Sequence, residues 1–191
     1  MKNYLFGYGS LLCPESINTT LKRKIPENQL FRADLQEYAR IWNLIDHVIM
    51  IESGKKEEAV FLNVIINKNS GVNGVMFEIT DEEIENFDNR EKNYERVDVT
   101  DNIFPKVENK GEITVYTYVG KSKFLIDNFK NPIVLEKYHN IVLKGLSYWG
   151  EHFSNEFFKN IIKAGTLPMV RGDYQFLDKI QNSITGRSEE Q

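Results

Sequence analysis

FGYGSLLCPES, residues 6–16, joins a short apolar run to the start of a helix through two glycines. Tyr4–Phe6 predicts a strand, and the proline and acid at the end of the stretch suit the first turn of a helix over Pro14–Lys22. Gly7 and Gly9 lack a side chain, so the backbone N–H groups between strand and helix can approach a ligand closely. Such a loop suits a carboxylate or a developing oxyanion, although an ordinary strand-to-helix turn also uses glycine for its shape.

The composition indicates a soluble globular protein. The 191 residues are 41% hydrophobic and 27% charged, and 24 basic against 28 acidic residues give a net charge of −4. This balance argues against a nucleic-acid surface, and no apolar run approaches the roughly 20 residues that span a bilayer. A single cysteine, Cys13, excludes internal disulfides, and three scattered histidines argue against a zinc site. We therefore expect a cytoplasmic monomer or homodimer without metal, cofactor, membrane or nucleic-acid partner.

Strand-like segments dominate the chain up to residue 119. Polar residues at Ser53–Glu58 and Asn67–Gly71 predict turns between strands. Thr80 and Glu83 have the spacing of a capping box, which predicts a helix over Asp81–Glu91. Apolar, β-branched or alternating residues predict strands at Phe31–Leu44, Ala59–Ile66, Gly74–Ile79, Tyr94–Thr100 and Ile113–Val119.

Helical patterns dominate after Pro132. One helix is expected where apolar residues recur at helical spacing between residues 135 and 149, and a second over Phe153–Ile162. The segregation of strands and helices predicts an α+β fold with a small closed or strongly curved sheet. We expect residues 1–150 to form this domain and residues 151–191 to be a helical extension packed on it. The apolar residues that predict the first of the two helices are Leu135, Tyr138, Val142, Leu146 and Trp149.

The helix after Thr80 carries a candidate catalytic carboxylate. Ile84, Phe87 and Glu91 are spaced i, i+3 and i+7, so they share one helical face. Two of them are apolar, which puts the Glu91 carboxylate on or beside the buried face. Desolvation there raises the pKa toward that of a general base working at neutral pH. Alternatively, Glu91 ends the helix and points outward, or pairs with Arg90 or Lys92 at the surface. Asp88 is a rival carboxylate on part of the same face.

Two other features carry weaker signals. Cys13 could act as a nucleophile with a histidine, but no local pattern supports this, and a buried or incidental thiol is the simpler interpretation. Tyr116 and Tyr118 alternate with valines in their strand, so one hydroxyl could line a cleft, although tyrosines in such strands usually pack in a core.

The ordered set of motifs resembles the γ-glutamylcyclotransferase-like family. Its members open with a strand and a YGS-x-L loop, which residues 8–12 match. A G-hydrophobic-hydrophobic-[YF]-x-[LI] strand follows, then a D-x-x-E helix motif that Asp88 and Glu91 match. Tyr94 and Arg96 fit the next strand motif of the family, Y-x-R-V-x-V. The resemblance spans about residues 4–146.

The resemblance implies a small mixed β-barrel with surrounding helices that needs no metal or cofactor. It also implies a reaction in which the α-amino group of a γ-glutamyl compound attacks its own γ-carbonyl. The products are 5-oxoproline and a released amine or amino acid. Glu91 takes the family's catalytic acid/base position. The residues implied to bind the substrate are Tyr8, Gly9, Ser10, Leu11, Leu12 and Tyr118.

The resemblance leaves the leaving group and two other functions open. The loop reads YGSLL rather than the YGSNL of animal amino-acid-type enzymes, and Cys13 stands where the glutathione-specific branch typically has tryptophan. A catalytically silent binding or interaction protein on the same scaffold is one alternative. Related acyl chemistry, such as amide hydrolysis, is the other. Turnover of γ-glutamyl compounds tests the first alternative, and a product of 5-oxoproline rather than glutamate tests the second.

Overall fold

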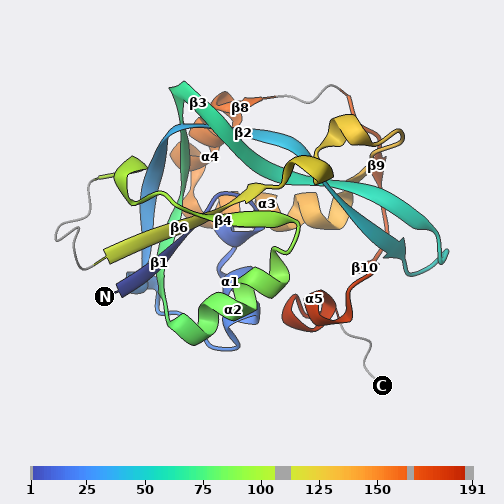
Figure 1. Cartoon of the computed structure of the whole chain (residues 1–191), viewed down its shortest axis with the longest axis horizontal. Coiled ribbons are helices and arrows are strands. Elements are labelled where there is room, and N and C mark those ends of the chain that lie inside the picture. Colours follow the sequence, from blue (N-terminus) through green and yellow to red (C-terminus); the bar gives the residue numbers. More distant parts are fainter. Residues whose placement is uncertain (1, 106–112, 163–165, 188–191) are drawn as a thin grey trace.

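The computed structural model describes residues 2–105, 113–162 and 166–187. The helices are α1 (Pro14–Leu21), α2 (Asp81–Arg90), α3 (Glu136–Trp149), α4 (Glu151–Lys159) and α5 (Lys179–Ile184). Short 3-10 turns lie at Ser10–Leu12, Glu27–Gln29, Thr100–Asn102, Ser122–Phe124 and Ile126–Asn128. The strands are β1 (Lys2–Gly7), β2 (Leu30–Met50), β3 (Lys56–Ile79), β4 (Tyr94–Asp98), β5 (Ile103–Phe104), β6 (Ile113–Gly120), β7 (Val134–Leu135), β8 (Ile161–Ile162), β9 (Met169–Val170) and β10 (Tyr174–Phe176) (Figure 1).

A mixed sheet with helices around it confirms the expected α+β fold. Its main path runs β10-β2-β3-β1-β6-β4, and β5 and β8 pair with β2. β1 is antiparallel to β3 but parallel to β6. Among the described residues, the first and last strands of this path, β10 and β4, do not pair with each other. The strand pairings therefore describe an open sheet rather than the expected closed barrel.

The β2–β3 hairpin is a strongly bent part of the sheet (Figure 1). Figure 1 shows its two long strands bending together over the rest of the sheet. The register between them shifts twice, at Gln36/Tyr38 and at Trp42/Leu44. Such bulges bend a strand and increase its twist. Glu37, inside the first shift, has a φ of 66°, which is the left-handed conformation.

The turn predicted at Asn67–Gly71 is wrong, because these residues lie within β3. Gly71 pairs with Gln36, and Ile66 pairs with Tyr38, so the strand continues past the polar residues. Between these two pairs only Glu37 lies opposite residues 67–70, so the polar composition reflects a bulge in a continuous strand rather than a reversal of the chain. Likewise, the turn predicted at Ser53–Glu58 ends earlier, because β3 already begins at Lys56.

The segment after residue 150 is less helical than expected. The helix predicted over Phe153–Ile162 ends at Lys159, and Ile161–Ile162 pairs with β2 as a parallel strand. β10 adds an antiparallel strand to the other end of β2 before α5 begins. The extension therefore joins the sheet as well as covering it. Residues 163–165 and 188–191 of the predicted extension lie outside the described residues.

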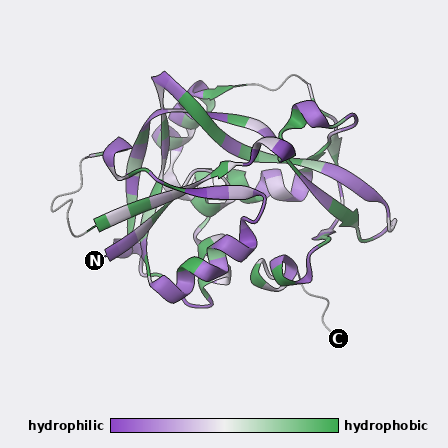
Figure 2. Ribbon diagram, viewed as in Figure 1, coloured by the Kyte–Doolittle hydropathy of each residue, from purple (hydrophilic) through white to green (hydrophobic). Residues whose placement is uncertain are grey.

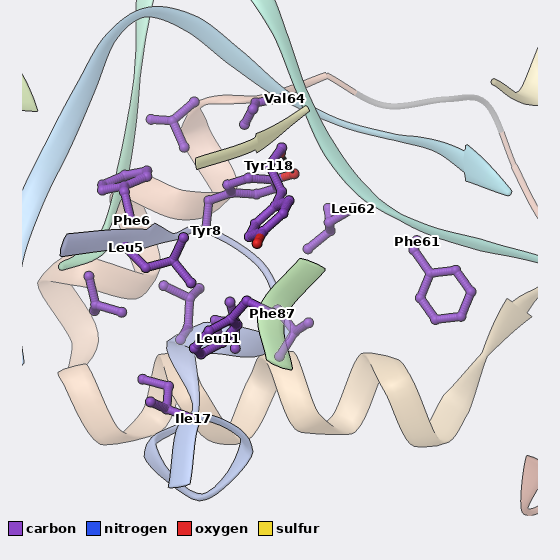
Figure 3. Close-up of a cluster of buried hydrophobic side chains, with 14 of the residues drawn as sticks. Leu5, Phe6, Tyr8, Leu11, Ile17, Phe61, Leu62, Val64, Phe87 and Tyr118 are labelled. Carbon is purple, nitrogen blue, oxygen red and sulfur yellow. Dashed lines mark hydrogen bonds between the residues drawn. The ribbon is translucent and has the colours of Figure 1, made fainter. Parts of the chain in front are cut away.

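The N-terminal strand and the first two helices enclose a hydrophobic core. Leu5 and Phe6 on β1, Ile17 on α1 and Phe87 on α2 are each at most 1% exposed (Figure 3). Apolar and polar stripes lie side by side on α2 (Figure 2), and the predicted capping box at its start is confirmed. This packing fixes the C-terminal end of α2 beside the loop that follows β1.

Candidate active site

Glu91 directly follows α2 and closes the C-terminal end of that helix. Its N–H donates to the Phe87 carbonyl at 2.8 Å. Phe87 is fully buried, and Glu91 follows it by one helical turn, so the carboxylate faces inward and its side chain is 16% exposed. Burial raises the pKa of Glu91 above its usual value, Arg90 opposes that shift, and the charge of Asp46 adds to it.

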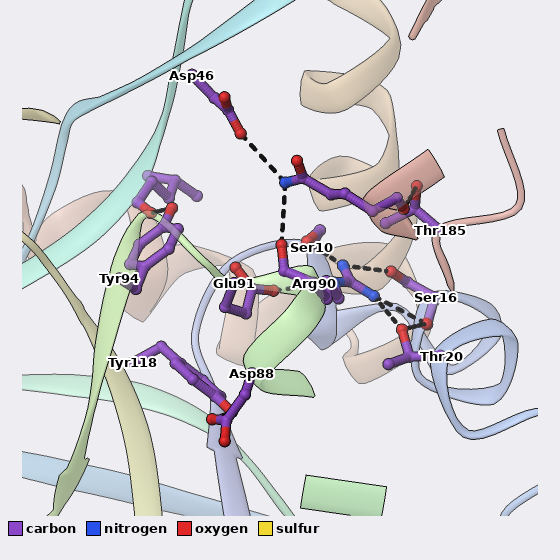
Figure 4. Close-up of polar contacts among 12 residues, drawn as sticks. Ser10, Ser16, Thr20, Asp46, Asp88, Arg90, Glu91, Tyr94, Tyr118 and Thr185 are labelled. Carbon is purple, nitrogen blue, oxygen red and sulfur yellow. Dashed lines mark hydrogen bonds and ion pairs between the residues drawn. The ribbon is translucent and has the colours of Figure 1, made fainter. Parts of the chain in front are cut away.

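Arg90 ties Glu91 to two other parts of the fold (Figure 4). Its Nε donates to Glu91 Oε1 at 2.8 Å, and Nη2 donates to Ser10 Oγ at 2.9 Å in the loop after β1. The same guanidinium reaches α1, where it donates to Ser16 Oγ at 3.1 Å and to Thr20 Oγ1. One buried cation therefore fixes the carboxylate, the loop and α1 relative to one another.

The glycine loop faces Glu91 across a small cavity. This cavity of about 30 Å³ is lined by residues of the loop and by Glu91, with three tyrosines completing the wall. A Cβ on Gly7 would lie 2.6 Å from Leu11 Cβ, and one on Gly9 would lie 3.1 Å from Tyr138 Oη. Glycine is required here by close approach rather than by a positive φ. The first amides of the 3-10 turn at Ser10 have no carbonyl one turn back to bind, as at any helix start.

Arg40 fixes the same loop from the side of the sheet. Its Nε donates to the Tyr8 carbonyl at 3.0 Å, and its guanidinium lies 3.9 Å from the centre of the Phe157 ring. The side chain is fully buried, and burial lowers the pKa of Arg40 to about 9, so the residue remains a cation at neutral pH. Its charge is satisfied by carbonyl oxygens and an aromatic face rather than by a carboxylate among the described residues.

A larger cavity of about 270 Å³ adjoins the small one. This volume is near the lower end of small-molecule sites, which run from roughly 300 to 1,000 Å³. Five segments build the wall: the loop with α1, the β2–β3 hairpin, the end of α2 with the start of β4, helix α3, and the C-terminal segment. Glu91, Ser10, Tyr94 and Tyr138 line both cavities. The C-terminal segment contributes Tyr174, Phe176, Gln181, Thr185 and Arg187.

Asp46 on β2 is a second buried carboxylate in the wall of the larger cavity. Its Oδ2 accepts from Gln181 Nε2 at 3.1 Å, and its Oδ1 accepts from the His47 N–H at 2.8 Å. Burial raises the pKa of Asp46, and these hydrogen bonds oppose the shift. Each Asp46 oxygen therefore already accepts a hydrogen bond, whereas Glu91 Oε2 accepts none from the described residues.

The family model described as gamma-glutamyl cyclotransferase, AIG2-like, matches residues 5–139 of the 191. The chain belongs to this family. The match contains the loop, α2 with Glu91, and most of α3's first turn, but it ends before the C-terminal segment of the cavity wall. Comparison with curated proteins gives no match.

Two solved structures of low sequence identity share the fold of this family member. A gamma-glutamyl cyclotransferase is 14% identical, with 97% of this chain and 99% of the other covered and a TM-score of 0.55. An uncharacterised human protein is 16% identical over 96% and 98% of the two chains, with a TM-score of 0.54. A protein of Arabidopsis thaliana is 28% identical over 68% and 75%, with a TM-score of 0.46.

The structure brings most of the predicted site residues of this cyclotransferase-family chain together. Tyr8, Gly9, Ser10 and Leu11 share the small cavity with Glu91. Leu12 differs from expectation: it is not among the residues that line either cavity, its side chain is fully buried, and its carbonyl accepts the Trp149 indole N–H at 2.8 Å.

Tyr118 lies at the small cavity, but its hydroxyl is already engaged. It donates to Asp88 Oδ1 at 2.7 Å, while the Tyr118 carbonyl accepts from Tyr8 Oη at 2.6 Å. The donor of its hydroxyl is therefore already used within the protein. Asp88, the rival carboxylate, pairs with Arg96 at 2.8 Å, has a side chain 45% exposed, and lines neither cavity.

Cys13 is a buried thiol that donates to Glu15 Oε2 at 2.9 Å. Burial raises the pKa of Cys13, which disfavours the reactive thiolate. Across the described ranges, no group of three His, Cys, Asp or Glu side chains could hold a metal ion. No helix in the same ranges is long and apolar enough to cross a membrane.

Several site residues, among them Asp46, Arg40 and Arg187, were missed by the sequence analysis. An aspartate inside the apolar run WNLIDHVIMI, residues 42–51, is itself a signal, since an acid in a buried strand needs partners. Arg40 stands beside apolar residues in the same strand and carries a similar signal. No local signal marks Arg187, because its place in the cavity depends on how the C-terminal segment folds back.

Proposed function

We propose that this protein is a γ-glutamylcyclotransferase that uses Glu91 as its general acid and base. The α-amino nitrogen of a γ-glutamyl compound forms a bond to its own γ-carbonyl carbon, and the bond from that carbon to the departing nitrogen breaks. The products are 5-oxoproline and a free amine or amino acid. No water is consumed, and no covalent bond to the enzyme forms.

Glu91 provides the proton transfers of this reaction. An ammonium group is not a nucleophile, so Glu91 first takes a proton from the α-ammonium group of the substrate and later gives one to the departing nitrogen. The pKa of Glu91 is raised by burial, which favours both roles near neutral pH. Arg90 holds Oε1 and leaves Oε2 for the substrate.

The observation that carries the proposal is that Glu91 and the glycine loop line the same small cavity. The first amides of the 3-10 turn, at Gly9 to Leu11, are donors for an oxyanion that develops on the γ-carbonyl oxygen. Folding of the substrate into a near-cyclic conformer between carboxylate and loop then supplies much of the rate acceleration. The membership of the chain in the cyclotransferase family supports the same reaction.

The test is the replacement Glu91→Gln, which keeps the size of the side chain and removes proton transfer. With γ-glutamyl-alanine as substrate, we expect kcat to fall by about two orders of magnitude or more, since general acid–base catalysis contributes roughly 10²–10⁴-fold. Release of 5-oxoproline is measured by chromatography. Because the change also removes the negative charge that pairs with the buried Arg90, thermal unfolding of the variant checks that it still folds.

Glu85→Gln is the matched control, because Glu85 lies on the exposed face of the same helix. This variant should retain the parent rate. Unchanged 5-oxoproline release by Glu91→Gln would contradict the role of Glu91. Glutamate as the product would instead indicate hydrolysis, and no turnover of any γ-glutamyl compound would indicate a silent binding protein.

A further inference from the structure

Arg187 brings a positive charge into the wall of the larger cavity. Its guanidinium stacks against two rings, 4.6 Å from the centre of Tyr174 and 5.3 Å from that of Phe176. Nη2 donates to Tyr174 Oη at 2.8 Å, and Nη1 donates to the Thr185 carbonyl at 3.3 Å. Nη1 and Nη2 each carry two N–H groups, and Nε has no partner, so several donors of the fork remain.

The other cations and acids around this cavity are already matched. Arg90 pairs with Glu91 at 2.8 Å, and Lys144 pairs with Glu15 at 2.9 Å. The Asp46 carboxylate is held by the Gln181 amide and a backbone N–H. Arg187 is different, because no carboxylate of residues 2–105, 113–162 or 166–187 lies within salt-bridge distance of it.

We propose that Arg187 binds a carboxylate on the departing half of the substrate. The inference rests on the cyclotransferase function proposed above. A γ-glutamyl group held between Glu91 and the glycine loop leaves its departing half in the larger cavity, which Glu91 also lines. A planar guanidinium binds carboxylates through paired hydrogen bonds, and the two rings hold it in place. The substrate is thus a γ-glutamyl amino acid or peptide rather than a γ-glutamyl amine.

A cationic departing group is the competing occupant, with Asp46 as its partner. Two observations count against it. Both oxygens of Asp46 already accept hydrogen bonds, from Gln181 and from the His47 N–H. A cation in this cavity would also lie among the charges of Arg90 and Arg187, and only the first of these is paired with an acid among the described residues.

The experiment compares two substrates that differ by one carboxylate, γ-glutamyl-alanine and γ-glutamyl-ethylamide. For the parent protein, we expect kcat/KM to be on the order of 10- to 100-fold higher for the alanine compound. This is the difference expected when one charge-assisted hydrogen-bond pair, between the carboxylate and Arg187, is present or absent. In Arg187→Met this ratio should collapse toward one, and Arg187→Lys should restore part of it. Thermal unfolding of each variant checks that the stacked segment still folds.

Arg171→Met is the matched control, because Arg171 is 85% exposed and pairs with Glu136 outside the cavity. It should keep the parent ratio. Equal kcat/KM values for the two substrates in the parent, or a ratio that survives in folded Arg187→Met, would overturn the proposal. If neither substrate turns over, the proposed function fails, and calorimetric titration of both compounds into the parent and Arg187→Met decides the role of Arg187 independently.

Discussion

At the scale of single residues, the site depends on two buried acids with different surroundings. Glu91 has one oxygen bound by Arg90 and the other left for a ligand, whereas both oxygens of Asp46 accept hydrogen bonds from the protein. Burial raises the pKa of both groups, and the charge of Asp46 raises that of Glu91 further. Asp46 therefore influences Glu91 without itself being available as the base.

This arrangement predicts the acid limb of the pH profile. The base works only when deprotonated, so kcat/KM should rise with pH through the raised pKa of Glu91, above the usual value of about 4.3 for glutamate. Asp46→Asn removes a negative charge that disfavours ionisation of Glu91, so this limb should move to lower pH. Glu85→Gln, an exposed acid on α2, should leave the limb in place. A limb that stays fixed in Asp46→Asn would contradict the coupling of the two acids.

At the scale of elements, α3 packs directly on the glycine loop. Gly145 lies in the middle of α3, and a Cβ there would lie 2.7 Å from both the Cys13 nitrogen and the Leu12 carbonyl carbon. Backbone atoms cannot move aside as the end of a flexible side chain can. The helix and the loop therefore approach each other through the one position that has no side chain, and the Trp149 indole adds a hydrogen bond to the Leu12 carbonyl.

Gly145→Ala separates helix propensity from this close approach. In an exposed helix the change would stabilise by roughly 1 kcal/mol, but overpacking costs typically 1–3 kcal/mol and here the neighbours are backbone. We expect a net loss of unfolding free energy in urea, and a lower kcat because the loop is displaced. Ser147→Ala, an exposed position on the same helix, should be neutral or slightly stabilising. If Gly145→Ala is more stable than the parent and fully active, the loop can move away from the added methyl group without loss of stability or activity.

At the scale of the whole molecule, the C-terminal segment completes the site that the N-terminal segment begins. Gln181 on α5 donates to the Arg90 carbonyl at 2.9 Å and to Asp46 Oδ2 at 3.1 Å. It thereby joins the end of α2 to the middle of β2. Lys92 and Asp178 add an ion pair at 2.9 Å beside it, although both side chains are about one-third exposed and contribute little.

Gln181→Ala tests this connection. The change leaves the Arg90 carbonyl and an Asp46 oxygen without their partner in a buried place, which costs about 1–3 kcal/mol. We expect that loss of unfolding free energy in urea, together with a raised KM because the wall containing Arg187 loosens. Ser183→Ala, exposed on the same helix, should match the parent in both measurements. Parent-like stability of Gln181→Ala would mean that α5 is held mainly by its apolar contacts.

The local parts of this protein can be predicted from short stretches of its sequence. The glycine loop, α1 and the capped α2 follow from short-range patterns, because caps, turns and helical faces are set within one or two turns of chain. For Glu91 those patterns left two positions open, and the structure has it at the end of the helix, buried and paired with Arg90. The same patterns misplaced the turn at Asn67–Gly71, since polar composition cannot distinguish a bulge in a continuous strand from a reversal.

The surroundings of Glu91 depend on contacts between segments that are distant in the sequence. Asp46, Gln181 and Arg187 are far from it in sequence, and they meet it because β10 pairs with β2 and α5 contacts the end of α2. Strand pairing and buried hydrogen bonds between distant segments carry no local pattern, because each depends on the final position of both partners. The place of Glu91 at the end of α2 is therefore a local property of the sequence, whereas the cavity around its carboxylate depends on the whole fold.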